Sequence, residues 1–379
     1  MNNYSFNDIK KRIDSINEEL LQIDVERMYR GANLFEGKAG YILYLYYTGV
    51  YYDDKLLQNR ALDYLDDLII SLNNLEYQSY GLYDGYTGIF WLIKHLVKYD
   101  IIDPEYSVLH KDYDEVLTNN VYALLSNRNY DFLHGSLGMI YYLMYNEKDL
   151  YLHNELIEKF KKESIKYLKN QVEAKLYGLA HGISGILLLY IYLYENRFSF
   201  TSLEAECLNE IVDDLLTHLR NINPNNVIKD ESAFYRFTWC NGNTGIVYAL
   251  ARSLKCDLLK NDYRNEIKEL LGYISVLSDH KKLGLIDTCL CHGTAGNLQV
   301  FNNLYSRLNK KDILIAVETW ANKTMLYGLF KDVKTGYKYW NGSDCVPNYS
   351  LIRGLAGTAL GLMNYCDKRI SSWDEFFLI

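Results

Sequence analysis

Hydrophobic and polar positions alternate along this chain in long blocks. Stretches that are apolar on every side, such as GIFWLIKHLV (88–97), GMIYYLMY (138–145) and GILLLYIYLY (185–194), are separated by longer stretches in which apolar residues recur every three or four positions. A spacing of three or four is typical of a helix with one buried face, whereas a helix that is apolar all round is buried between other layers. The pattern therefore predicts an all-α protein in which outer and inner helices alternate.

Each apolar stretch begins at a Gly-x-x-Gly motif, and this motif occurs seven times. The first glycines of the motifs are Gly37, Gly85, Gly135, Gly182, Gly242, Gly293 and Gly354. Their mean spacing of about 53 residues accommodates two helices of about 15 residues and two loops. We expect these glycines to allow tight turns with positive φ and close approach of the inner helices. The sequence thus predicts seven helix-pair repeats in one domain, 1–379, with extended loops within 186–241 and 297–353.

Periodicity alone leaves two architectures open, an open solenoid and a closed ring. Inner helices that are apolar on every side favour the ring, because an open array would expose its concave face to water.

Composition and charge exclude several classes of protein. Hydrophobic residues make up 49% of the chain and charged residues 23%, as in globular proteins. A net charge of −8 and the lack of an extended Lys/Arg stripe argue against a nucleic-acid partner. The sequence contains no signal-peptide core and no run of 18 apolar residues. Seven cysteines, an odd number, then favour free thiols and a cytoplasmic location.

The residue directly before the first glycine is polar in all seven motifs. These residues are Glu36, Asp84, His134, His181, Asn241, His292 and Arg353. A purely structural loop would also carry small or apolar residues at this position. All seven precede the N-terminus of an expected inner helix, where unpaired backbone N–H groups favour anions and thiolates. If the repeats surround an axis, these side chains converge on one rim, and we place the chemistry there.

Two of these motifs, in adjacent repeats, carry residues that bind metals. They are WCNG (239–242) and CLCHG (289–293). Two thiolates and an imidazole from Cys240, Cys291 and His292 would leave a tetrahedral zinc ion with one open position, as in a catalytic site. The alternative is that the cysteines are buried thiols that bind nothing. We expect Cys289 to point away from the site, with competition for the metal as its alternative.

The seven glycine motifs, WCNG and CHGTAG (291–296) together resemble the lanthionine synthetase C-like family over essentially the whole chain. This resemblance implies a closed α/α toroid of seven outer and seven inner helices. It implies one Zn²⁺ per chain held by Cys240, Cys291 and His292, and catalytic positions at His181, Asp131 and Arg236. The chain departs from the family at Asn241, where many members carry Tyr, which puts a phenol's part in proton transfer in doubt.

The family resemblance also implies a reaction, the addition of substrate cysteine thiols to dehydroalanine or dehydrobutyrine to form (methyl)lanthionine rings. In this hypothesis His181 protonates the α-carbon, with His134 as the second candidate, and Asp131 orients His181 or balances its charge. Arg236 stabilises the enolate oxygen or fixes Asp131. Which group delivers the proton stays open. Each residue also has a structural interpretation: a helix-start histidine bonded to backbone, a turn-capping aspartate and a surface ion-pairing arginine.

Because helical repeats occupy the whole chain, we expect a separate dehydratase as a partner. The other expected partners are a dehydrated precursor peptide with a leader and, as an option, an export complex. Two alternative functions stay open, an enzyme that adds glutathione to dehydroamino acids and a zinc-stabilised peptide-binding scaffold without catalysis. A sugar-acting α/α toroid is disfavoured, because such sites use paired carboxylates and Asp131 has no equivalent partner beyond Glu36 and Asp84.

Overall fold

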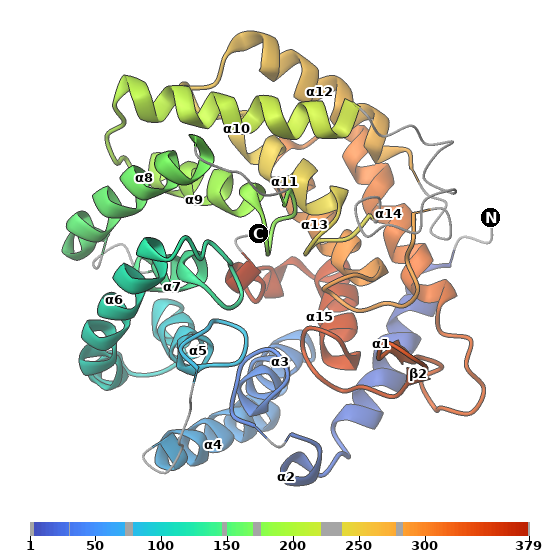
Figure 1. Cartoon of the computed structure of the whole chain (residues 1–379). Coiled ribbons are helices and arrows are strands. Elements are labelled where there is room, and N and C mark those ends of the chain that lie inside the picture. Colours follow the sequence, from blue (N-terminus) through green and yellow to red (C-terminus); the bar gives the residue numbers. More distant parts are fainter. Residues whose placement is uncertain are drawn as a thin grey trace. The chain divides into compact units, whose positions relative to one another are not determined.

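The computed structural model describes residues 4–29, 31–72, 79–145, 150–169, 176–220, 237–277 and 283–377. These residues are mostly helical, as Figure 1 shows. The helices are α1 (Phe6–Leu20), α2 (Val25–Met28), α3 (Lys38–Tyr51), α4 (Lys55–Leu72), α5 (Tyr86–Lys98), α6 (Lys111–Ser126), α7 (Ser136–Leu143), α8 (Asn154–Lys169), α9 (Ile183–Glu195), α10 (Ser202–Arg220), α11 (Asn243–Ser253), α12 (Asn261–Ser275), α13 (Thr294–Leu308), α14 (Lys311–Leu326) and α15 (Leu355–Cys366). The strands β1 (Tyr339–Trp340) and β2 (Cys345–Val346) form a short antiparallel hairpin in the longer loop before α15.

The predicted alternation of inner and outer helices is confirmed. Seven helices begin one residue after the first glycine of a motif: α3, α5, α7, α9, α11, α13 and α15. Helix α9 buries ten of its 13 residues, whereas α8 buries a stripe of six of 16. Fully buried inner side chains such as Trp91 and Tyr190 each contribute about 2–3 kcal/mol of hydrophobic stabilisation.

The motif glycines serve close approach rather than positive φ. The first glycines Gly37, Gly85, Gly135, Gly182, Gly293 and Gly354 have φ between −148° and −111°, so the predicted positive φ is wrong. A Cβ atom on the second glycines Gly40, Gly138, Gly185, Gly296 and Gly357 would lie 2.0–2.6 Å from the carbonyl oxygen six residues earlier. Glycine is needed there because each inner helix starts pressed against its own loop.

Contacts divide the chain into two compact units. The first unit contains residues 1–76, 224–244 and 270–379, and the second contains 77–223 and 245–269. In the first unit, α3 packs on α4, α13 packs on α14, and α15 contacts both α1 and α3. In the second unit, α7 lies between α5 and α9, and α6, α8 and α10 form a second row that contacts them (Figure 1).

Backbone hydrogen bonds join the motif loops of successive repeats within the second unit. The N–H of Tyr83 donates to the carbonyl of Leu133 at 2.9 Å, and the N–H of Phe132 donates to the carbonyl of Ala180 at 2.8 Å. These bonds hold the loops before α5, α7 and α9 in register with one another.

The same kind of bond links three repeats of the first unit. The N–H of Leu290 donates to the carbonyl of Ile352, and the N–H of Ile352 donates to the carbonyl of Phe35, both at 3.0 Å. The second of these bonds joins the seventh repeat to the first. The two repeats are therefore neighbours, although they lie at opposite ends of the sequence.

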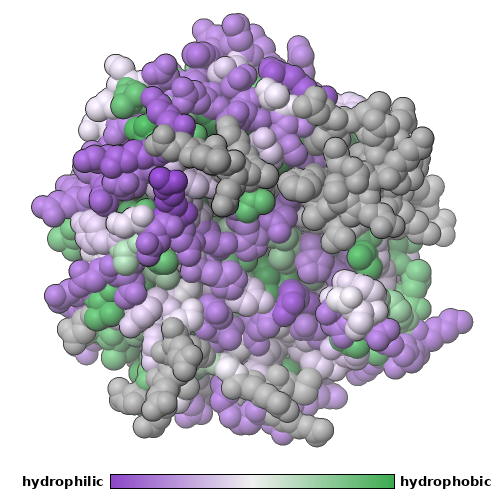
Figure 2. Space-filling model, viewed as in Figure 1, coloured by the Kyte–Doolittle hydropathy of each residue, from purple (hydrophilic) through white to green (hydrophobic). Residues whose placement is uncertain are grey.

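Polar side chains predominate on the face of the molecule shown in Figure 2, and apolar residues there form only small groups. Among the described residues, no helix has both the length and the apolar character needed to cross a bilayer.

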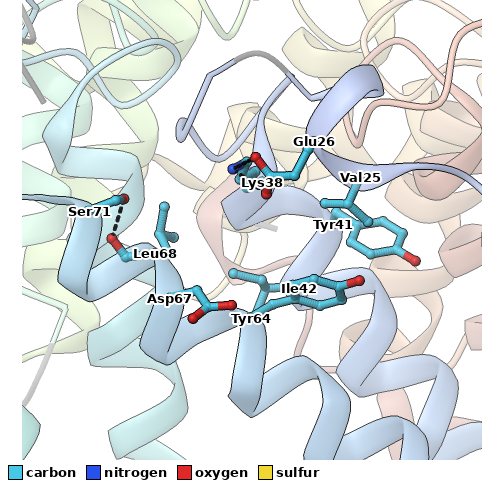
Figure 3. A pocket seen from close by; sticks show the side chains of 9 residues that line it. All are labelled: Val25, Glu26, Lys38, Tyr41, Ile42, Tyr64, Asp67, Leu68 and Ser71. Carbon is cyan, nitrogen blue, oxygen red and sulfur yellow. Dashed lines mark hydrogen bonds and ion pairs between the residues drawn. The ribbon is translucent and has the colours of Figure 1, made fainter.

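A small pocket opens between α2, α3 and α4 (Figure 3). It is lined by Val25, Glu26, Lys38, Tyr41, Ile42, Tyr64, Asp67, Leu68 and Ser71. Its lining includes no histidine or cysteine, so the predicted thiol and metal chemistry belongs elsewhere.

Candidate functional site

Two motif loops of the first unit bring cysteine side chains together. The loops that precede α11 and α13 are joined by a hydrogen bond from the N–H of Cys240 to the carbonyl of Cys291, at 3.3 Å. The neighbouring thiol of Cys240, together with burial, raises the pKa of Cys291 well above its ordinary value. Two cysteines from adjacent repeats are thus neighbours in the fold.

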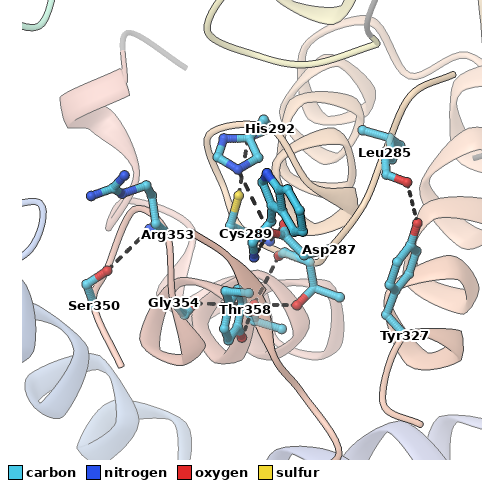
Figure 4. A network of polar contacts seen from close by, with 12 residues as sticks. Leu285, Asp287, Cys289, His292, Tyr327, Ser350, Arg353, Gly354 and Thr358 are labelled. Carbon is cyan, nitrogen blue, oxygen red and sulfur yellow. Dashed lines mark hydrogen bonds and ion pairs between the residues drawn. The ribbon is translucent and has the colours of Figure 1, made fainter. Parts of the chain in front are cut away.

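A second set of donors lies in the loop before α13. Ligand atoms of Asp287, Cys289 and His292 all lie within 4.8 Å of one another. Among the described residues, these three form the group that is close enough together to hold a metal ion. The Nε2 atom of His292 is 3.8 Å from Oδ2 of Asp287, and its backbone N–H donates to the sulfur of Cys289 at 3.4 Å (Figure 4). Burial raises the pKa of the Cys289 thiol well above its ordinary value. We call these three residues together with Cys240 and Cys291 the thiol cluster.

Asp287 is fixed in place by the backbone around it. Its side chain is buried, and its two carboxylate oxygens accept hydrogen bonds from the N–H groups of Cys289 and Trp340, each at 2.9 Å. Trp340 belongs to β1, so the hairpin before α15 supports the loop before α13. The carboxylate is therefore positioned before any ligand arrives.

The predicted and the observed donor sets overlap but are not the same. The structure brings Cys240 and Cys291 together, and it turns the imidazole of His292 toward Asp287 and Cys289. Cys289 therefore does not point away as expected; its alternative, competition for the metal, agrees with the geometry. Thiolate, imidazole and carboxylate are the ligands that zinc takes in proteins. A divalent cation would also supply the positive charge that buried thiols need to ionise. The residues present fit a zinc ion.

A histidine–aspartate pair lies in the second unit. The Nδ1 atom of His181 is 2.5 Å from Oδ2 of Asp131, and Oδ1 of Asp131 accepts the N–H groups of Leu133 and His134 at 2.8 Å each. Burial raises the pKa of Asp131, but the bonds from His181 and His134 outweigh it, so the pKa lies below its ordinary value. Asp131 is therefore an ionised carboxylate that both caps its own loop and holds the His181 ring.

Three further predicted positions are Arg236, Asn241 and Arg353. Arg236 lies outside the described residues. Asn241 is exposed, and Arg353 forms an ion pair with Glu36, which joins the last motif to the first. Sequence reasoning missed Asp287. The available signal was a lone acidic residue in the stretch GLIDTCLCHG, five positions before His292.

Comparison with known proteins places this geometry in context. A family model described as lanthionine synthetase C-like protein matches residues 29–378. The nisin biosynthesis protein NisC of Lactococcus lactis subsp. lactis is 25% identical over 323 residues, which cover 73% of this chain and 75% of NisC. The lacticin 481/lactococcin biosynthesis protein LcnDR2 of the same organism is 23% identical over 315 residues, which cover 79% of this chain. The chain spans only about a third (32%) of the length of LcnDR2.

A solved structure shows the fold. Nisin cyclase matches 98% of this chain and 96% of its own chain with a TM-score of 0.68 and 18% sequence identity. The chain thus has the α/α-toroid fold of that protein. The closed ring, rather than the open solenoid, is confirmed.

Proposed function

Since the chain belongs to the lanthionine synthetase C-like family, we propose that it is a zinc-dependent cyclase. It adds a cysteine thiol of a peptide to dehydroalanine or dehydrobutyrine in the same peptide, forming a lanthionine or methyllanthionine ring. The observation that carries this proposal is the backbone hydrogen bond that joins Cys240 to Cys291, with His292 next to Cys291 in the chain. Two cysteines and a histidine would hold a zinc ion with one position open for the thiol of the substrate.

We assign Cys240, Cys291 and His292 as the ligands of one Zn²⁺ per chain. When bound, zinc lowers the pKa of a coordinated thiol and so makes a substrate cysteine a nucleophile at neutral pH. Asp287 then acts as the carboxylate partner of His292, since metal-binding histidines commonly pair their second ring nitrogen with a carboxylate. The competing ligand set is Asp287, Cys289 and His292, in which Asp287 and Cys289 replace Cys240 and Cys291.

The reaction moves one proton and leaves the peptide mass unchanged. A C–S bond forms at the β-carbon, the C=C π bond breaks, the thiol loses its proton and the α-carbon gains one. His181 is the proposed acid. Asp131 holds its Nδ1 and stabilises the imidazolium form, which assigns proton transfer to Nε2. Arg236, next to the WC motif in the sequence, is the proposed partner of the enolate oxygen.

The proposed substrate is a dehydrated precursor peptide with a leader, made by a separate dehydratase in the cytoplasm. Its support is that NisC and LcnDR2 are named for the biosynthesis of nisin and of lacticin 481.

The decisive experiment incubates the purified, zinc-loaded protein with a peptide that carries one cysteine and one dehydroalanine. We expect the peptide to lose its free thiol without any change in mass. The loss is measured by adding iodoacetamide, which alkylates a remaining free thiol but not a thioether ring. A peptide that keeps its thiol in the presence of folded, zinc-containing protein overturns the proposal of a cyclase. The alternative of a peptide-binding scaffold without catalysis then remains. A product that gains the mass of one glutathione, when glutathione is added, supports the glutathione-adding enzyme instead. Cys291→Ala serves as the inactive control.

A further inference from the structure

A second histidine–aspartate pair lies beside the first in the second unit. The Nδ1 atom of His134 is 3.6 Å from Oδ1 of Asp84. In both pairs the Nδ1 side of a histidine faces a carboxylate from the preceding repeat. We call His181 with Asp131 the inner dyad and His134 with Asp84 the outer dyad. A histidine therefore faces a carboxylate in two successive repeats, at hydrogen-bonding distance in the inner dyad and at 3.6 Å in the outer dyad.

The two dyads are held together by direct contacts. The rings of His134 and His181 are nearly parallel, with an interplanar angle of 10° and centroids 6.5 Å apart. The backbone N–H of His134 donates to Oδ1 of Asp131, the carboxylate whose other oxygen contacts His181. The helices that follow these loops, α5, α7 and α9, lie side by side (Figure 1). The spacing of the two rings is therefore set by the backbone.

The dyads differ in their access to water. The side chains of His134 and Asp84 are 47% and 45% exposed, compared with 28% and 24% for His181 and Asp131. The hydroxyl of Ser79 donates to Oδ1 of Asp84 at 2.8 Å, which fixes the outer carboxylate. The charged and titratable groups facing His134 are Asp84, Asp131 and His181, together with the ring of Tyr83 at 5.1 Å.

We propose that His134 is a proton relay that recharges His181 between turnovers. This inference rests on the proposed function. In each turnover His181 gives one proton to the α-carbon of the substrate, and the imidazolium of His134 passes one proton to His181 through a bridging water. His134 regains a proton from solvent, which has received the proton lost by the substrate thiol, so the proton count closes. Histidine suits this exchange because its charge changes between pH 5 and 8.

The test separates the first turnover from the steady state in His134→Gln. The relay acts only after His181 has given up its first proton, so we expect a first-turnover rate within about 3-fold of the wild type and a steady-state rate lower by about 10- to 100-fold. Imidazole added to the buffer should restore the steady state, because it replaces the missing relay. His181→Ala should lose both phases, and His153→Gln, outside the dyads, should change neither.

Two results overturn the relay alone. The first is a steady-state rate of His134→Gln equal to that of the wild type. The second is a first turnover of His134→Gln that is slowed as much as its steady state, which would indicate that His134 has a structural role. A wild-type protein that cyclises no peptide overturns the proposed function and the relay with it. The wild-type measurement therefore distinguishes the two failures.

Discussion

The thiol cluster and the two dyads occupy the same place in their repeats but differ in burial. Both are built on loops that end at a motif glycine and lead into an inner helix. In the thiol cluster, Cys289 and Asp287 are 0–1% exposed and Cys240 is 8% exposed, whereas the imidazole of His292 is 27% exposed. In the dyads, the side chains are 24–47% exposed. One backbone arrangement thus supports a cluster with buried sulfur and carboxylate groups and two dyads that are partly exposed to water.

This difference separates two kinds of chemistry. Burial raises the pKa of the thiols, so the cluster needs a cation before its sulfurs ionise. The larger exposure of His134 gives the outer dyad access to water, while Asp131 stays ionised because its hydrogen bonds outweigh its burial. The repeat keeps the backbone constant and lets the residues around the glycine select metal binding or proton transfer.

Removal of one sulfur should give the largest effect. We expect Cys291→Ala to weaken zinc binding by more than about 1,000-fold, since the site loses one of three protein ligands. Zinc content per chain, measured by mass spectrometry of the metal, should fall from about one to near zero while the helix content by circular dichroism is kept.

The competing ligand set is tested by Cys289→Ala. This variant should keep its zinc, as should the control Cys256→Ala in the loop between α11 and α12. Zinc lost from Cys289→Ala and retained by Cys291→Ala would assign the metal to Asp287, Cys289 and His292 instead.

A methyl group on the second motif glycine tests whether the two regions share one scaffold. The added Cβ would lie 2.0 Å from the Leu290 carbonyl in Gly296→Ala and 2.1 Å from the Phe132 carbonyl in Gly138→Ala. Each variant should lower the free energy of unfolding by about 3 kcal/mol, measured by denaturant titration.

The matched control for these glycines is Gly361→Ala, within α15. Its Cβ would meet no atom closer than 3.6 Å, so helix propensity should raise stability by up to about 1 kcal/mol. A Gly138→Ala variant as stable as the wild type would show that the dyad loops tolerate displacement and that the scaffolds differ.

Asp131→Asn should affect the inner dyad without affecting zinc. We expect the cyclisation rate to fall by about 10- to 100-fold, because the ring of His181 loses its charged partner. Because the folded state lowers the pKa of Asp131, its stabilisation is present above the usual carboxyl pKa and is lost as the pH falls through the lowered value. The stability difference from the wild type should therefore be largest near pH 7 and shrink on acidification. A pH-independent difference would contradict this account of the carboxylate.

Asn241→Ala should give the smallest effect. The exposed amide beside Cys240 does not titrate, so we expect retained zinc and a rate within about 3-fold of the wild type. A loss as large as that of His181→Ala would show that the amide takes part in the reaction.

The helices were predictable because each has a local signature. The glycine motifs and apolar blocks located all seven inner helices, whose buried faces depend only on the period of the pattern. The contact between His181 and Asp131 links the same two motifs that the resemblance singled out.

Other features depend on packing that no local pattern encodes. Gly37 has an extended backbone and is glycine because the loop around Asn33 leaves no room for a Cβ, and the sequence does not show that crowding. The side chain of His292 turns to Asp287 because a buried carboxylate fixed by Trp340, 53 residues away, lies beside it. Contacts of such sequence separation are visible only in the folded chain.

The bond between Ile352 and Phe35 also affects how the protein is made. The ribosome releases the first repeat 317 residues before the loop that completes it. At about 5–20 residues per second this interval lasts roughly 15–60 s. During that time the nascent first repeat lacks the helix α15, which packs on α3 in the folded chain, and its apolar surface stays open to aggregation.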